Sequence, residues 1–145
     1  MPCASNAVDD VVVDASVFVS RIVRADAHHA PTLEWFRGRA ELDTFFVVPA
    51  LMPAEVAGAV ARRIQSGPRA RHAVNQLMRL PTLRVIAIDR KVGERAADLA
   101  ADLGLRGADA IYVALARILT LPLVTWDAEQ HRRSQGTVEA LTPSA

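Results

Sequence analysis

Short apolar runs alternate with longer amphipathic segments along the chain, and this alternation predicts its secondary structure. Four runs rich in β-branched or aromatic residues have the length of buried strands, and they cover residues 11–13, 45–48, 83–88 and 122–125. Apolar positions at helical spacing fill the segments between them, at residues 15–24, 52–65, 69–80, 90–103 and 108–119. Pro31 fits the first turn of a further helix, and a short polar helix and a weak strand near Val138 close the chain.

Proline, serine, glycine and aspartate mark several of the expected boundaries. Pro49 is expected to close the second strand, and the Ser-Gly-Pro segment at 66–68 to end the helix before it. Asp89 suits the N-cap of the helix over 90–103, and Gly104 its C-terminal stop. Because strands and helices alternate throughout, the pattern predicts a three-layer α/β/α sandwich with a mostly parallel central sheet.

Length and composition limit the class of protein. The chain has 145 residues, of which 51% are apolar and 23% charged, so we expect one domain over residues 1–145 with a flexible tail over residues 1–10. No apolar run approaches the ~20 residues of a membrane-spanning helix, and the first residues lack the pattern of a secretory signal. The lone Cys3 cannot form an internal disulfide. These features predict a cytoplasmic protein that does not enter a membrane.

The net charge of +1 hides an asymmetry along the sequence. Six arginines and no acidic residue lie between Glu55 and Asp89, so this segment carries +6 and the rest of the chain −5. Such a basic segment is the electrostatic footprint of a protein that binds a polyanion or an acidic partner, although a solvated helix face gives the same pattern. The candidate nucleic-acid contacts are Arg62, Arg63, Arg69 and Arg71.

Four carboxylates occupy corresponding places at the ends of the predicted elements. Asp14 follows the first strand and Asp127 the strand over 122–125, while Glu55 and Asp109 fall in the first turns of two helices. Ligands of parallel α/β sheets bind beyond the carboxyl ends of the strands, where all four side chains can converge. Each one has a structural explanation too, because acidic residues also cap helices and favour the positive end of the helix dipole.

Four clustered carboxylates raise one another's pKa unless a cation compensates them. A hard divalent ion such as Mg²⁺ or Mn²⁺ prefers carboxylate and water oxygens, can activate a bound water and can stabilise charge on a phosphoryl oxygen. We expect Asp14, Asp109 and Asp127 to be ligands, and Glu55 to complete a catalytic set that hydrolyses phosphodiesters. Ser16 and Thr125 are candidate supporting hydroxyls.

Two aromatic or imidazole features are less specific. The pair His28-His29 has no cysteine or spaced acidic partner, so a zinc site is not indicated. Trp126, beside Asp127, could stack on a base, but an aromatic residue at a strand end more often packs against the core. The chain has neither a GxGxxG nor a Walker phosphate loop.

Four stretches together resemble the PIN-domain ribonucleases, and within them the VapC-type toxins of VapBC toxin–antitoxin systems. They are VVVDASVFV, PALMPAEVAGAV, LRGADAIYVALA and PLVTWDAEQ, which occur in the family's order and spacing from about Val11 to His131. The acidic positions of the family match Asp14, Glu55, Asp109 and Asp127, and its hydroxyl positions match Ser16 and Thr125. Trp126 departs from the pattern, since a small residue or Asn is commoner there.

The resemblance implies properties that the residues alone do not. It implies an RNA substrate, Mg²⁺ dependence, a homodimer and neutralisation by a cognate antitoxin, which typically blocks the acidic pocket with a basic side chain. The apolar faces of the early helices, with Leu33, Trp35 and Phe36, are candidates for the oligomer surface.

Two other function classes stay open on the sequence. The first is a non-catalytic module that binds a partner or nucleic acid through the acidic crevice and the arginine face. The second is a phosphohydrolase with Asp14 as nucleophile, as in haloacid-dehalogenase-like enzymes. The second is disfavoured, because Ser16 replaces the acid/base Asp and no clear catalytic Lys follows.

Overall fold

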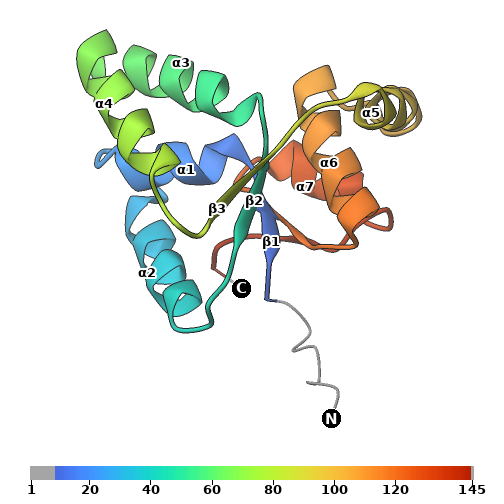
Figure 1. Cartoon of the computed structure of the whole chain (residues 1–145), viewed down its shortest axis with the longest axis horizontal. Coiled ribbons are helices and arrows are strands. Elements are labelled where there is room, and N and C mark those ends of the chain that lie inside the picture. Colours follow the sequence, from blue (N-terminus) through green and yellow to red (C-terminus); the bar gives the residue numbers. More distant parts are fainter. Residues whose placement is uncertain (1–8, 145) are drawn as a thin grey trace.

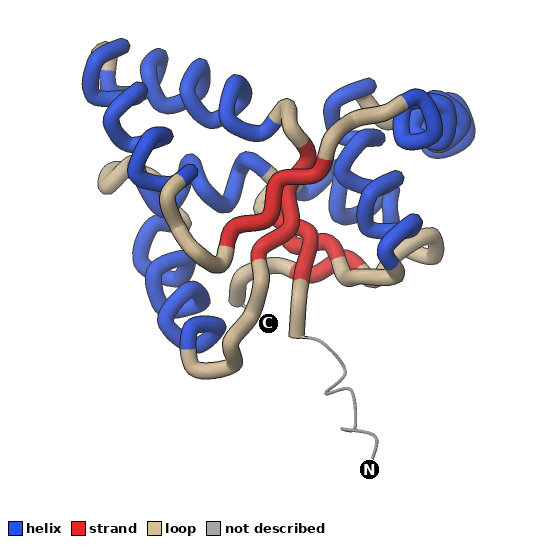
Figure 2. The backbone as a smooth tube through the Cα atoms, viewed as in Figure 1, coloured by secondary structure: helices blue, strands red, loops and turns tan. Residues whose placement is uncertain are grey.

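The structure, a computed structural model, describes residues 9–144. Its strands are β1 (Val11–Val13), β2 (Phe46–Pro49), β3 (Leu83–Ile86), β4 (Leu123–Val124) and β5 (Ala140–Leu141). Its helices are α1 (Ala15–Ile22), α2 (His29–Ala40), α3 (Met52–Ile64), α4 (Gly67–Met78), α5 (Arg90–Leu103), α6 (Gly107–Leu119) and α7 (Ala128–Ser134). Figure 2 shows the strands at the centre with helices on both sides, so the predicted three-layer α/β/α sandwich is confirmed.

The order of the strands explains the two helical layers. They lie in the order β3-β2-β1-β4-β5, and every neighbouring pair is parallel. The chain moves from β1 outward to β2 and β3, then crosses back to β4 and β5. Because crossovers between parallel strands are right-handed, this reversal puts α1 to α4 on one face of the sheet and α5 to α7 on the other (Figure 1). The carboxyl ends of β1 and β4 therefore form a topological switch point, where a crevice opens.

The core is built around β1 and α6. The three valines of β1 are at most 1% exposed, as expected for the central strand of a parallel sheet. Helix α6 contacts β1 and β2 on one side and α5 on the other, which is why its sequence is apolar on most sides. Because α6 is packed in the core, the position of its first turn, which carries Asp109, is fixed relative to β1.

Several element boundaries differ from the sequence prediction. Pro49 is the last residue of β2, paired with Ile86, rather than a stop after it. The segment at 66–68 begins a helix: the Ser66 side chain accepts a hydrogen bond from the Arg69 N–H, so α4 starts two residues earlier than expected. The preceding helix, α3, ends at Ile64, one residue before the predicted end, and its C-cap Gln65 has a left-handed φ of 52°. The strand expected near Val138 lies at residues 140–141.

The two caps of α5 agree with the sequence. The Asp89 side chain accepts a hydrogen bond of 2.9 Å from the Val92 N–H, and Gly104 ends the helix with a φ of 66°. Since L side chains rarely adopt that conformation, glycine is the residue that suits this stop.

The structure bears on three expectations from the sequence: the N-terminal tail, the oligomer surface and the lack of a membrane-spanning helix. The predicted flexible tail lies outside the described residues as far as residue 8, and Cys3 lies outside them with it. Trp35 and Phe36 are each only 8% exposed and pack against Phe46, so the predicted oligomer face on these two residues is wrong. Among residues 9–144, no helix has the length and apolar character needed to cross a membrane.

Candidate active site

A pocket of about 470 Å³ opens at the switch point between β1 and β4. All four predicted acidic residues line it, although they come from four different segments: Asp14 follows β1, Glu55 lies in α3, Asp109 in α6 and Asp127 before α7. The structure therefore brings together the side chains that the sequence selected. Their ligand and catalytic roles stay a prediction.

Asp14 is the most buried of the four, with 6% of its surface exposed. It is the N-cap of α1 and accepts hydrogen bonds at Oδ2 from the Ser16 N–H, at 3.0 Å, and from Thr125 Oγ1, at 3.3 Å. Burial raises the pKa of the Asp14 carboxyl and the charge of Asp109 adds to this, against the opposing effect of those hydrogen bonds. The Asp14 side chain thus both caps α1 and lines the pocket.

The two predicted hydroxyls fasten the ends of β1 and β4 to each other. Ser16 Oγ and Thr125 Oγ1 lie 3.3 Å apart, and Ser16 Oγ accepts a hydrogen bond of 3.1 Å from the Trp126 N–H. The single proton of the Thr125 hydroxyl is shared between Asp14 Oδ2, at 3.3 Å, and Gln130 Oε1, at 2.8 Å, and the hydroxyl oxygen accepts from the Asp127 N–H at 3.0 Å. These contacts hold the backbone on both sides of the pocket in place. Ser16 does not supply the second acid of a dehalogenase-like site.

Glu55 is held by a buried phenol. Tyr112, with 0% exposed surface, donates a hydrogen bond of 2.7 Å from its hydroxyl to Glu55 Oε1. Burial raises the pKa of Glu55, as do the charges of Asp14 and Asp109, while the hydrogen bond from Tyr112 lowers it. Burial and the nearby carboxylates also raise the pKa of Tyr112, so the phenol keeps its proton and stays a donor.

An arginine that the sequence analysis missed spans the other two carboxylates. Arg106 Nε lies 3.0 Å from Asp109 Oδ2, and its Nη2 lies 3.2 Å from Asp127 Oδ2. Burial raises the pKa of Asp109 even so, because the hydrogen bond and charge of Arg106 compensate it only in part. Asp127 also caps α7 by accepting a hydrogen bond from the Gln130 N–H at 2.9 Å. The guanidinium is thus a counter-ion supplied by the chain itself.

The side chains do not form a closed metal cage as they lie. Within residues 9–144, no three or more His, Cys, Asp or Glu side chains gather closely enough to hold an ion. Asp109 and Asp127 are instead paired with Arg106, whose side chain is 79% exposed.

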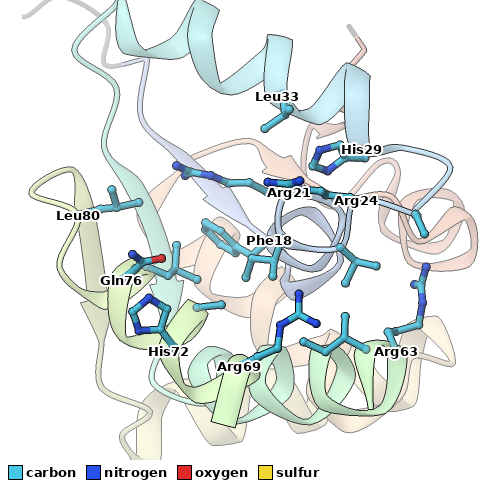
Figure 3. A pocket seen from close by; sticks show the side chains of 16 residues that line it. Phe18, Arg21, Arg24, His29, Leu33, Arg63, Arg69, His72, Gln76 and Leu80 are labelled. Atoms are coloured by element: carbon cyan, nitrogen blue, oxygen red, sulfur yellow. The ribbon is translucent and has the colours of Figure 1, made fainter. Parts of the chain in front are cut away.

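The predicted arginines divide between two surfaces. Arg62 and Arg63 line the acidic pocket, and Arg63 pairs with Asp26 at 3.1 Å. Arg63 and Arg69 line a larger groove of about 960 Å³ formed by α1, α2, the end of α3 and α4 (Figure 3). Arg71 is exposed on α4 and lines neither.

The groove is lined by both apolar and cationic side chains. Its apolar lining includes Phe18, Leu33 and Leu80, and its cationic lining includes Arg21, Arg24, Arg63 and Arg69. None of the residues that line it is acidic. The groove is the larger of the two hollows, but it contains no carboxylates to activate water, so the smaller pocket is the candidate for chemistry.

Sequence reasoning missed Arg106, which lines the pocket, and two buried residues behind it, Tyr112 and Gln130, which hydrogen-bond to Glu55 and Thr125. Arg106 stands three residues before Asp109, a spacing that brings two side chains together on a helix, and this was a usable signal. Tyr112 and Gln130 gave none, because their contacts depend on how distant segments pack.

The fold and its acidic crevice define a parallel α/β sandwich with a site at the switch point. A family model described as the PIN domain matches residues 11–135. The chain belongs to the PIN domain family. No curated protein matches it in sequence.

Solved structures share this fold at low sequence identity. VapC20 from Mycobacterium tuberculosis, described as a sarcin–ricin loop cleaving toxin, is similar with a TM-score of 0.71 and 17% identity over 83% of this chain and 92% of its own. FitAcB from Neisseria gonorrhoeae has a TM-score of 0.69 and 20% identity over 92% and 97%. VapBC2 from Rickettsia felis, solved with a DNA fragment from its promoter, has a TM-score of 0.68 and 13% identity over 92% and 98%.

Proposed function

We propose that this protein is a Mg²⁺-dependent endoribonuclease that acts as the toxin of a type II toxin–antitoxin pair. The observation that carries the proposal is the pocket at the switch point of a PIN fold, where Asp14, Glu55, Asp109 and Asp127 converge from four segments. The structural neighbours include proteins described as toxins and as toxin–antitoxin complexes, which supports the same assignment.

The chemistry of the pocket fits a hard divalent cation. Its candidate ligands are the carboxylate oxygens of Asp14, Asp109 and Asp127, and Mg²⁺ or Mn²⁺ prefers such donors. Mg²⁺ usually takes one or two carboxylates and keeps several waters, so it does not need three converged side chains. The burial of Asp14 close to other carboxylates also leaves negative charge that one guanidinium only partly offsets.

The residues of the chain divide the work of hydrolysis between them. When bound, the ion supplies the charge that activates water and stabilises a phosphoryl oxygen. Asp14 is oriented by the Ser16 N–H and Thr125. Glu55, held at Oε1 by Tyr112, is suited to accept the proton of the attacking water, because its raised pKa brings it nearer to neutral pH.

RNA binding falls to the arginines beside the pocket. Arg62 and Arg63 line it and can contact the phosphates on either side of the cleaved bond. Arg69 and Arg71 lie on the next helix, α4, where they extend the positive surface so that it can bind a longer RNA strand.

The antitoxin is proposed to occupy the arginine-lined groove of Figure 3. An amphipathic segment with acidic residues complements its apolar and cationic side chains. Arg63 lines both the groove and the acidic pocket, so a partner bound in the groove lies next to the pocket and can block RNA. A homodimer is part of the same proposal, and light scattering of the purified chain tests it.

One observation favours a second candidate, a binding module without catalysis. Arg106 already pairs with both Asp109 and Asp127, so the crevice has a partial counter-ion without metal. A module of this kind predicts no Mg²⁺ dependence of any activity.

Cleavage of RNA by the purified protein tests the proposal. We expect end-labelled tRNA and ribosomal RNA to be cut in Mg²⁺, and to stay intact in EDTA or with Asp14→Asn. Asp98→Asn, which changes an exposed aspartate on α5, is the matched control and should cut normally. Expression in a bacterial host should arrest growth for the wild type and this control, but not for Asp14→Asn. Cleavage that persists in both EDTA and Asp14→Asn would overturn the proposal.

A further inference from the structure

An imidazole lies flat on an indole at the rim of the acidic pocket. The rings of His28 and Trp126 are stacked, with centroids 4.0 Å apart and planes inclined by 8°. Both residues line the pocket together with Asp14 and Asp127. His28 is exposed, whereas Trp126 is half-buried against the core. Because one face of the imidazole covers the indole, its other face is available to solvent.

Hydrogen bonds hold both rings in this arrangement. Trp126 Nε1 donates to Thr32 Oγ1 at 2.8 Å, and the same hydroxyl donates to the His28 carbonyl at 2.7 Å. Thr32 is fully buried, so the indole cannot turn without leaving polar atoms unpaired. The His28 N–H donates at 2.8 Å to Asp26 Oδ1, which fixes the backbone that carries the imidazole.

Asp26 ties this loop to two helices of the pocket. Its Oδ1 also accepts from Ser20 Oγ of α1 at 2.9 Å, and its Oδ2 accepts from Arg63 of α3 at 3.1 Å. An exposed ring is therefore mounted on a rigid support. Packing alone does not require this, since an exposed histidine stacked on the outer face of an indole adds little to the core.

We propose that the His28–Trp126 stack is a nucleobase-binding subsite, on which a base next to the cleaved phosphate stacks against the free face of His28. This inference rests on the proposed function. Every nucleobase has an aromatic face, and unpaired RNA bases are commonly bound by stacking on aromatic side chains. Arg62 lines the same pocket and is exposed, so it can hold the phosphate of that nucleotide.

A base-stacking subsite and a charged surface can be distinguished by what they bind. Stacking requires a base, whereas arginines bind the phosphates of any strand. The protein should therefore prefer a strand with bases to a ribose–phosphate strand without them. That preference should depend on His28 and Trp126, while the overall affinity and its salt dependence should depend on Arg62.

The experiment measures binding of two labelled 12-mers by fluorescence anisotropy in EDTA, which keeps the strands uncut. One strand is oligo(rA) and the other is an abasic ribose-spacer strand of the same length. We expect the wild type to bind oligo(rA) roughly tenfold more tightly, and His28→Ala to lose most of this preference. His28→Phe should keep it, because the aromatic plane remains. Arg62→Gln should weaken both strands equally.

His131→Ala is the matched control, since His131 lies on α7 and lines neither hollow, and it should bind like the wild type. An unchanged preference in both His28→Ala and Trp126→Leu would overturn the subsite and leave the proposed function standing. A wild type that binds both strands equally well would do the same. Absence of binding to either strand would overturn the proposed function, and this inference with it.

Discussion

The hydroxyl of Tyr112 donates a hydrogen bond of 2.7 Å to Glu55 Oε1, and so joins the buried helix α6 to the first turn of α3. The phenol is 0% exposed. Tyr112 therefore orients Glu55 from the interior of the protein, while Glu55 itself lines the pocket. The bond also opposes the effect of burial on the pKa of Glu55.

Replacing Tyr112 by Phe tests this positioning role. Loss of the donor should raise the pKa of Glu55 further, because burial and the charges of Asp14 and Asp109 remain. We expect the cleavage rate to fall roughly tenfold and the acidic limb of its pH profile to move to higher pH. The measurement is the rate of RNA cleavage from pH 5 to 9. A lower rate with an unmoved acidic limb would assign Tyr112 to structure alone.

Replacing Asp14 by Asn separates stability from activity. The change removes a buried charge but keeps an oxygen that accepts from the Ser16 N–H. We expect cleavage to be lost, and the melting temperature of the metal-free protein to rise by a few degrees, as about 1 kcal/mol gives in a domain of this size. Thermal unfolding in EDTA measures this effect. A lower melting temperature would show that the ionised carboxylate stabilises the fold.

The stability of the metal-free protein should increase as the pH falls from neutral through the raised pKa values of the pocket carboxyls. Burial raises the folded-state pKa of Asp14, Glu55 and Asp109 above their values in the unfolded chain. The unfolded chain therefore ionises first as pH rises, and the folded state loses stability up to the raised pKa. Below the ordinary values of 3.8 for Asp and 4.5 for Glu this gain levels off.

Asp26 acts in the opposite sense in acid. Burial raises its pKa, but hydrogen bonds from the His28 N–H, Ser20 and Arg63 outweigh that effect and lower it below 3.8. Its contribution to stability is thus lost only as pH falls below that value. Urea unfolding in EDTA at several pH values checks the whole profile, and Asp14→Asn should flatten the rise from neutral pH towards 4.5. A wild-type stability that falls as the pH is lowered from neutral towards 4.5 would contradict the electrostatics of the pocket.

Replacing Arg106 by Gln should strengthen metal binding. The guanidinium contacts two of the proposed ligands, Asp109 and Asp127, and repels a divalent ion in the same place. We expect Mn²⁺ to bind roughly tenfold more tightly at low salt, with a smaller gain at high salt. Calorimetry with Mn²⁺ measures the change. Arg90→Gln, which breaks the exposed pair with Glu94 on α5, should leave the affinity unchanged, and weaker binding in Arg106→Gln would make the arginine a support of the site.

Replacing Arg62 and Arg63 by Ala should reduce the salt dependence of RNA binding. Removing one arginine that binds a phosphate lowers the slope of log K against log salt by about 0.7 for a single strand. Replacing Arg69 and Arg71 should also reduce it, because α4 continues the positive surface. Affinities of an uncut strand at three salt concentrations in EDTA give the slopes. A slope that either double variant leaves unaltered removes that pair from the RNA-binding face.

Much of the fold and the four acidic residues could be predicted because their signals are local. The valines of β1 and the apolar α6 are continuous in sequence, and Asp14 and Asp127 closely follow their strands. Placement at the carboxyl ends of parallel strands then brings such residues to one edge without knowledge of the strand order.

The rest could not be predicted because it depends on contacts across the fold. Trp35 and Phe36 are apolar residues on a helix, and only the packed structure shows that they face Phe46 rather than solvent. The bond from Tyr112 to Glu55 joins residues 57 positions apart. From the sequence, Trp126 at a strand end is likewise expected to pack against the core. Only the structure shows that His28 stacks on its ring.

Titration of the purified protein with Mn²⁺, followed by calorimetry, is a test of the metal site that needs no knowledge of the RNA. We expect a saturable site in the wild type from which Mg²⁺ displaces Mn²⁺, which Asp14→Asn and Asp109→Asn abolish and Asp98→Asn leaves intact. Absence of saturable binding in the wild type, or binding that survives both pocket substitutions, would contradict this expectation.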